Sequence, residues 1–275
     1  MKKILSLLVV AVLMLGMMSM SASAARDLKY TAQYGSATID GVYEDAWDIN
    51  GSAWTEIDLH HDGSADSVCA ARAKMMHDDS LIYFFVEITD ATLANKDLEL
   101  TAMDQFEIYL DEDACKDVAY CENSYQLGMT LAAEVRAGTN ADAVGAVECV
   151  KEFKVGTSEN GYTLEFSVAP LNGIPAADKA IGLEFMYQNS AEDGTFLDAL
   201  RWNVDTNAGD TAPWQAPEYW GELYCAEYVA PAVDETPVED VVDAPATTAP
   251  TTADAGIVVA AVVMAAAAAV VCKKH

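Results

Sequence analysis

The sequence has few basic residues and few histidines. It contains 15 Lys and Arg against 44 Asp and Glu, which gives a formal net charge of −29, and it has four His. Such an acidic chain repels the phosphates of nucleic acid and the head groups of anionic lipids. The composition therefore excludes a nucleic-acid-binding domain, and we expect no nucleic-acid partner.

Motifs that carry enzymatic chemistry are also missing. The sequence has no Gly-x-Ser-x-Gly turn, no Walker phosphate loop, no His-Glu-x-x-His motif and no Cys-x-x-Cys pair. Glu107 and Asp111 stand four residues apart on one predicted strand, which separates them by roughly 13 Å. The acid pairs of glycosidases lie about 5–10 Å apart. We therefore predict that the protein has no catalytic residues and is not an enzyme.

The two ends of the chain differ in composition from the middle. Residues 1–24 begin with lysines, continue as an apolar run and end in Ala-Ser-Ala, the pattern of a secretory signal peptide. Residues 230–254 are rich in Pro, Thr and acidic residues and predict an extended linker. Residues 255–272 are apolar and residues 273–275 are basic, which predicts a transmembrane anchor followed by a cytoplasmic tail.

These segments predict an exported protein that its C-terminal membrane helix holds at the cell surface. The same order of segments is typical of Gram-positive cell-wall sorting signals, but "PTTADAG" stands where the Leu-Pro-x-Thr-Gly motif would be. Attachment to the cell wall therefore stays the alternative to a membrane anchor. The remaining residues, 25–229, are enough for one large folded domain.

Short strand-like segments separated by turn residues fill this domain. Examples are "LIYFFVEITD", "DQFEIYLDED" and "GYTLEFSVAP", with "HDDS", "SENG" and "AEDGT" as turns. In the second segment, Phe106, Ile108 and Leu110 share one face, and the residues between them form a polar face that includes Glu107. We predict an all-β domain, an antiparallel β-sandwich of jelly-roll or immunoglobulin-like type.

Five motifs, in order along the domain, resemble family 9 carbohydrate-binding modules. They are "ATIDGVYEDAWD", "HDDSLIYFFVEITDATL", "DQFEIYLDED", "GYTLEFSVAP" and "WQAPEYWGEL", and the resemblance covers residues 30–227. It implies a β-sandwich of the DOMON-like group, a structural calcium ion and binding of the ends of glycan chains. It also implies that two tryptophans stack on the terminal sugar, while polar side chains hydrogen-bond its hydroxyls.

The resemblance carries over to two of the six ligand positions. Trp214 stands where the family has a clamp tryptophan, and Glu107 stands where it has a hydroxyl-binding glutamate. The other four positions differ from the family and are occupied by Thr101, Gln126, Gly128 and Thr211. Of these, Gln126 can still hydrogen-bond a sugar and is kept as a ligand-binding candidate.

The remaining tryptophans divide between core and site. In "RWNVD", Trp202 is favoured as a core residue but could contact a ligand, and Asn203 could hydrogen-bond a hydroxyl or cap a turn. Trp47 and Trp54 are expected in the core. In "PWQAPEYWG", two prolines stiffen the loop, so Trp214 is expected to face outward, while Tyr219 or Trp220 turns inward.

Two acidic loops, "LDEDACKD" and "DTNAGD", cluster carboxylates, as calcium sites do. Neither loop matches an EF-hand, and solvated loops are the alternative. The candidate ligands are Asp111, Asp113, Asp205 and Asp210. Cys115 and Cys121 flank a short loop and could form a disulfide, but the domain has an odd number of cysteines.

We predict a surface protein that binds poly- or oligosaccharide without cleaving it, either to hold the cell on a polysaccharide or to pass oligosaccharides to neighbouring enzymes. The alternative is a structural or protein-interaction domain that has lost sugar binding. A third possibility is a haem-binding domain of the DOMON-like group. Its axial ligands would come from Met75, Met76, His77 and Met129, although methionine ordinarily fills cores.

Overall fold

The structure is a computed structural model that describes residues 26–61, 69–91 and 102–229. The predicted signal peptide, linker, transmembrane anchor and basic tail, and also Thr101, lie outside the described residues.

The prediction of a C-terminal membrane anchor is corrected. In the part of the chain that the structure describes, no helix is long and apolar enough to cross a membrane. The longest helix in this part, the 3-10 helix η1 (Asp45–Gly51), has seven residues, whereas a membrane-spanning helix needs about 20. The location at the cell surface through such an anchor is therefore not supported.

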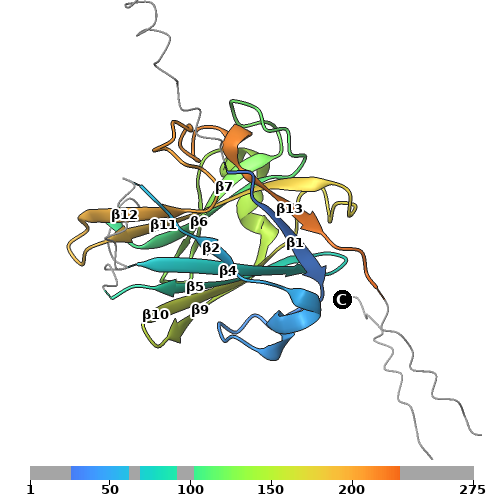
Figure 1. The fold of residues 1–275 in the computed structure, drawn as a ribbon, viewed down its shortest axis with the longest axis horizontal. Helices are drawn as coiled ribbons and strands as arrows, with labels where there is room; N and C mark the ends of the chain where they lie inside the picture. The colour runs from blue at the N-terminus through green and yellow to red at the C-terminus, as the bar shows by residue number, and fades with distance from the viewer. Residues whose placement is uncertain (1–25, 62–68, 92–101, 230–275) are drawn as a thin grey trace, which may run out of the picture. The chain divides into compact units, whose positions relative to one another are not determined.

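The described residues form two stacked layers of β-strands, as predicted (Figure 1). The first layer has the order β8 (Val135–Ala137), β7 (Ser124–Thr130), β6 (Gln105–Asp111), β11 (Ala180–Ser190) and β13 (Gly221–Cys225). β12 (Phe196–Arg201) pairs with β11 and with β3 (Leu59–His60). The second layer has the order β4 (Ala70–His77), β5 (Ile82–Thr89), β10 (Gly161–Val168) and β9 (Val150–Ser158), and β2 (Thr55–Ile57) pairs with β4. The short helices are η1, α2 (Ala141–Val144), η3 (Ala146–Cys149) and η4 (Pro217–Tyr219).

The first strand, β1 (Lys29–Tyr34), belongs to both layers. Its residues 29–32 run parallel to β13, and its last two residues run parallel to β4. The other registered pairs among the described strands are antiparallel. β1 therefore ties the two layers together along one side of the sandwich.

The core between the layers is built from the apolar faces of the strands. Phe106 and Phe185 of the first layer meet Phe84 and Phe166 of the second, and the rings of Phe84 and Phe166 stack with centroids 4.8 Å apart. All four are fully buried. Each such ring contributes about 1.5–3 kcal/mol to folding. The predicted apolar face of the segment around Phe106 is confirmed.

Residues 39–48 cross the outer face of the second layer, and one buried carboxylate holds them there. Glu165 of β10 accepts hydrogen bonds from the backbone N–H of Asp40 (2.8 Å) and Gly41 (2.7 Å) and from Trp47 Nε1 (2.9 Å). A Cβ at position 156 would lie 2.0 Å from the Gly41 carbonyl oxygen, so only Gly156 allows the segment to approach β9 this closely. Trp47 is fully buried, as predicted.

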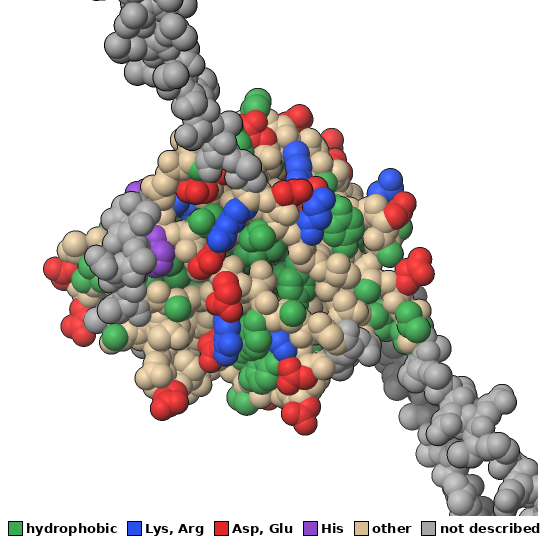
Figure 2. Space-filling view, viewed as in Figure 1, with side chains coloured by type: hydrophobic (Ala, Val, Ile, Leu, Met, Phe, Trp, Pro, Cys, Tyr) green, Lys and Arg blue, Asp and Glu red, His purple; other side chains and the backbone are tan. Residues whose placement is uncertain are grey.

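On the face shown in Figure 2, acidic side chains are scattered, and the basic ones mostly lie beside them. Glu222, for example, pairs with Lys116 Nζ at 2.9 Å and with Lys29 Nζ at 3.0 Å. Hydrogen bonds from Tyr224, Lys116 and Lys29 lower the pKa of Glu222 to about 2. Lys29 and Lys116 are therefore neutralised within the protein.

Candidate functional site

The candidate site lies on the outer face of the first layer, where the residues between the core positions of β6 and β7 are polar. Gln105, Glu107 and Tyr109 of β6 share this face, as their alternation predicts. They are not solvated, however, and Glu107 is only 6% exposed. The face is covered because the Trp220 ring packs against Tyr109, with ring centroids 5.5 Å apart, and the Tyr120 ring packs on Trp220.

Glu107 is the centre of a hydrogen-bond network on this face. Its Oε1 accepts from Gln105 Nε2 at 2.8 Å, and its Oε2 accepts from Gln126 Nε2 at 2.9 Å and from the Tyr109 hydroxyl. Burial raises the pKa of Glu107 to about 7, against the opposing effect of the hydrogen bonds from Tyr109 and Gln126. A carboxylate has about four acceptor sites, so Glu107 retains room for one more donor.

The loop that carries Trp214 is held next to this network. Thr139 donates from its Oγ1 to the Trp214 carbonyl oxygen (3.4 Å) and from its backbone N–H to Gln126 Oε1 (3.1 Å). A single residue thus joins Trp214 to the network around Glu107. The structure brings these three predicted site residues, Trp214, Gln126 and Glu107, to one place.

The orientation of the aromatic residues in this loop is as predicted. The Trp214 side chain is 40% exposed, whereas Trp220 is fully buried. Trp220 Nε1 donates to the Pro213 carbonyl oxygen at 3.2 Å, and the Tyr120 hydroxyl donates to the same oxygen at 3.3 Å. The buried Trp220 and the partly buried Tyr120 therefore support the loop and leave the Trp214 ring in contact with solvent.

The structure places Trp202 and Asn203 elsewhere. Trp202 is buried in the core against Phe185, and its Nε1 donates to Thr55 Oγ1 at 2.7 Å. Asn203 uses both ends of its amide within the protein, since Nδ2 donates to the Tyr219 carbonyl oxygen (2.6 Å) and Oδ1 accepts from the Leu28 N–H (2.9 Å). Core packing is favoured for Trp202 and backbone capping for Asn203, and contact of either residue with a ligand stays a prediction.

The first acidic loop brings together groups that could hold a cation. Asp111, Asp113, Cys115 and Cys121 each offer an atom within 4.8 Å of the others, and the two cysteines form a disulfide. The carboxylates are therefore the available ligands. Asp111 is fully buried, and burial raises its pKa to about 6, with the neighbouring Asp113 adding to the shift. Two adjacent carboxylates, one of them buried, fit a hard cation such as calcium.

The carboxylates of the second acidic loop accept hydrogen bonds from the backbone of the same loop. Asp205 Oδ1 accepts from the N–H groups of Asn207 (3.0 Å) and Ala208 (3.2 Å). Asp210 Oδ2 accepts from the Asp205 N–H at 2.8 Å. These bonds are typical of a self-capped turn. Of the two predicted calcium loops, the first therefore offers the better donor set.

The residues that the sequence offered as haem ligands take part in core packing and hydrogen bonding. Met75 and Met129 are buried in the core between the layers, and Met76 packs with Trp47 in a second cluster. His77 Nε2 lies 2.8 Å from the Ala226 carbonyl oxygen. Among the described residues, these side chains do not present a ligand pair to a haem.

Sequence reasoning missed a second buried carboxylate, which lies beside the site, opposite Tyr109 on the neighbouring strand. Glu184 of β11 accepts hydrogen bonds from the backbone N–H groups of Trp202 (2.7 Å), Asn203 (3.0 Å) and Val204 (3.1 Å). Burial raises the pKa of Glu184 to about 8. The carboxylate fixes the turn that leads from β12 towards the Trp214 loop. The alternation of "AIGLEFMYQNS" could have placed Glu184 on the polar face but could not have identified its partners.

The fold and the site define a β-sandwich binding module, in which one sheet face and its loops bring a buried carboxylate, an amide and an exposed tryptophan together. The chain belongs to the family described as carbohydrate family 9 binding domain-like, whose model matches residues 39–227. The predicted family is confirmed.

Solved structures share the fold. A family 9 carbohydrate-binding module from Caldicellulosiruptor kristjanssonii in complex with cellotriose superposes with a TM-score of 0.63 at 22% identity, over 75% of this chain and 97% of that one. A family 9 carbohydrate-binding module from the same organism, in complex with glucose, gives a TM-score of 0.62 at 22% identity, over 74% of this chain and all of that one (100%).

Curated relatives are much longer enzymes. Endo-1,4-beta-xylanase A of Thermotoga neapolitana is 25% identical over 193 residues, which is 70% of this chain and 17% of the relative. Exoglucanase XynX of Acetivibrio thermocellus is 27% identical over 204 residues, again 70% of this chain and 17% of the relative. The chain thus spans about a sixth of the length of these relatives, and its match to them is the match of one module.

Proposed function

We propose that this domain binds oligosaccharides and does not cleave them, and that it does so at Trp214, Glu107 and Gln126. The observation that carries the proposal is the buried Glu107 carboxylate, with a free acceptor position, beside an exposed tryptophan on a stiffened loop. Membership of the family supports it, as do the sugar ligands named for two solved structures of the same fold.

The aromatic and the polar side chains of the site would make different contacts with a sugar. The Trp214 ring offers a flat apolar surface on which the C–H groups of a pyranose pack. Glu107 then accepts a hydrogen bond from a sugar hydroxyl, and the Gln126 amide offers further polar contacts. A sugar whose hydroxyl does not meet Glu107 would leave a buried acceptor without its donor, which costs about 1–3 kcal/mol. Such a site selects sugars by the geometry of their hydroxyls.

We further propose that the chain has no hydrolytic activity of its own and corresponds to the binding part of the xylanases and the exoglucanase that it resembles. Release of reducing ends from xylan and cellulose by the purified full chain tests this proposal. We expect none above the level of buffer, and turnover that scales with protein concentration would contradict it.

Calorimetric titration of the full chain tests the site. With glucose, cellotriose, xylotriose and mannotriose as probes, we expect saturable binding of at least one sugar. The Trp214→Ala substitution removes the stacking surface and is expected to weaken that binding about tenfold or more. Tyr228→Ala is the matched control, because Tyr228 is also an exposed aromatic residue (62%) but lies outside the site.

Two results would contradict the proposed site. Equal sugar affinities of the Trp214→Ala protein and the unaltered chain would show that Trp214 is not part of the site. No binding of any probe by folded protein would favour the alternative of a protein-interaction domain.

We also propose that Asp111 and Asp113 bind a structural calcium ion. A ligand that binds the folded state at a hundred times its Kd stabilises that state by about 2.7 kcal/mol. For a domain of this size we expect calcium to raise the midpoint of thermal unfolding by roughly 5–10 °C over the value with a chelator. Asp111→Asn should abolish this difference, whereas Asp205→Asn, in the second loop, should keep it. Identical midpoints with calcium and with chelator would contradict the proposal.

A further inference from the structure

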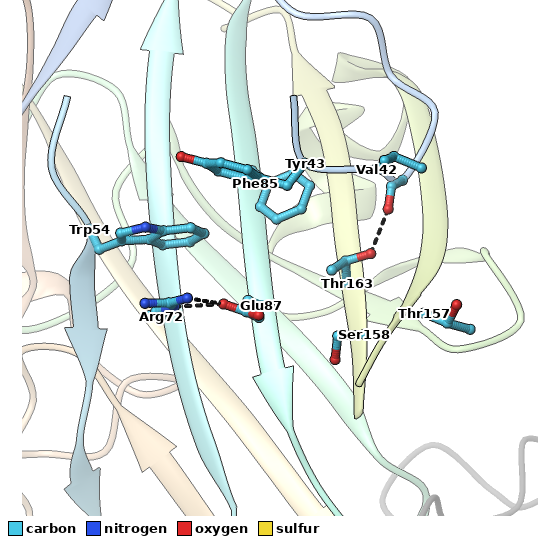
Figure 3. Close-up of a pocket in the computed structure, with 10 residues that line it drawn as sticks. Val42, Tyr43, Trp54, Arg72, Phe85, Glu87, Thr157, Ser158 and Thr163 are labelled. Atoms are coloured by element: carbon cyan, nitrogen blue, oxygen red, sulfur yellow. Dashed lines mark hydrogen bonds and ion pairs between the residues drawn. The ribbon is translucent and has the colours of Figure 1, made fainter. Parts of the chain in front are cut away.

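A groove opens on the outer face of the second layer (Figure 3). Its volume is about 350 Å³, within the range of small-molecule sites. The floor is formed by Phe85 and Glu87 of β5 and by Thr163 of β10. Around it stand Gly41, Val42, Tyr43, Trp54, Arg72, Thr157 and Ser158.

One wall of this groove is a rigid aromatic stack. The Trp54 ring lies between the Tyr43 ring, at 5.4 Å and 22° between planes, and the Arg72 guanidinium, 4.2 Å from its centroid. The edge of Phe85 supports both rings from the floor. Tyr43 is 37% exposed and Val42 is 61% exposed. Apolar surface therefore faces the groove without the entropy cost of ordering it on binding.

The two charged side chains that line this groove, Arg72 and Glu87, form an ion pair. Arg72 and Glu87 stand directly opposite each other on β4 and β5, and Arg72 Nε donates to Glu87 Oε2 at 2.6 Å. Their side chains are 42% and 31% exposed, so both keep free donors and acceptors. The nearby Lys74 is buried and already pairs with Asp48 at 2.6 Å. Such a groove suits a neutral polyhydroxyl ligand better than an ionised one.

The groove continues past the Arg72–Glu87 pair. A neighbouring hollow of about 220 Å³ shares both residues. It is otherwise lined by Glu56, Ala70, Ala71 and Thr89. Because the ion pair borders both hollows, a ligand that contacts the pair can extend in two directions. This shape fits units within a glycan chain rather than a single terminal sugar.

We propose that this groove is a second carbohydrate site, which binds internal units of a neutral glycan chain. Sugar rings pack against Tyr43, Val42 and the edge of Trp54, while the Arg72–Glu87 pair exchanges hydrogen bonds with their hydroxyls. The proposal shares only its ligand class with the function proposed above, because its residues lie on the other layer. One domain would then contact two chains, or two segments of one chain, on opposite faces.

The indole N–H signals of the five tryptophans, followed by NMR in the full chain, test this proposal. The probes are cellohexaose, xylohexaose and mannohexaose, added to about 10 mM so that millimolar affinities are seen. We expect the Trp54 signal to shift with at least one probe, and to do so also in the Trp214→Ala protein. Glu87→Gln should weaken that response about tenfold while leaving the Trp214 response unchanged. Asp58→Asn, which removes the carboxylate of the exposed Arg26 ion pair, is the matched control.

The outcomes separate the two sites. A Trp54 signal that stays fixed while the Trp214 signal moves would contradict the carbohydrate site in the groove and support the site at Trp214. A Trp54 shift that requires Trp214 would also contradict the site in the groove, because there would then be one site with an indirect effect. A Trp54 shift without a Trp214 shift would support the groove and contradict the first site. No shift of either signal would contradict both.

Discussion

Replacing Glu107 with glutamine is expected to weaken oligosaccharide binding by roughly thirtyfold at pH 8, or about 2 kcal/mol. The substitution keeps the shape of the side chain but removes the charge that strengthens a hydrogen bond from a sugar hydroxyl. It also turns an amide group towards Gln105 and Gln126, which both donate to Glu107 in the unaltered protein. Calorimetric titration with the best-binding sugar measures the effect.

The same substitution should abolish a pH dependence. Burial raises the pKa of Glu107 to about 7, so the ionised form is lost as the pH falls from 8 to 6. Affinity of the unaltered chain should therefore rise with pH across this interval, and affinity of the Glu107→Gln protein should stay constant. Glu122→Gln, at an exposed carboxylate of a neighbouring loop, should keep the pH dependence. Equal affinities of Glu107→Gln and the unaltered chain at both pH values would show that Glu107 does not contact the sugar.

Replacing Glu165 with alanine is expected to lower the free energy of unfolding by about 3–5 kcal/mol. The substitution leaves three donors, two backbone N–H groups and Trp47 Nε1, without their acceptor, and each buried unpaired donor costs about 1–3 kcal/mol. Chemical denaturation followed by tryptophan fluorescence measures the loss. Glu165→Gln keeps one acceptor atom and should lie between alanine and the unaltered protein.

Glu159 provides the control for this prediction. It is an exposed acidic residue in the turn between β9 and β10, so Glu159→Ala should change the free energy of unfolding by less than about 0.5 kcal/mol. If Glu165→Ala unfolds at the same denaturant concentration as Glu159→Ala, then Glu165 does not hold residues 39–48 in place.

The strands and their faces could be predicted because the pattern that defines them is local. Phe106, Ile108 and Leu110 alternate with polar residues, and the structure buries all three between the layers. Burial of the polar face was not predictable, because Trp220, which covers Tyr109, is far away in the sequence. Local alternation tells which way a side chain points but not what packs over it.

The groove on the second layer could not be predicted from the sequence for a similar reason. Trp54 was expected in the core, yet it is only half-buried and stacks between Tyr43 and Arg72. Its position depends on residues 39–48, which Glu165 holds from more than a hundred residues away. The parallel pairing of β1 with β13 also depends on residues far apart in the sequence. The membrane anchor was inferred from hydropathy alone and is not supported.

The parallel pairing of β1 with β13 determines how the domain carries tension. The chain enters the pair at the Lys29 end of β1 and leaves it at the Cys225 end of β13, so these two points lie at opposite ends of the pair. A pull between the N-terminal and C-terminal sides of the domain therefore acts along the strands. The hydrogen bonds between them are loaded in shear and must break together rather than one after another.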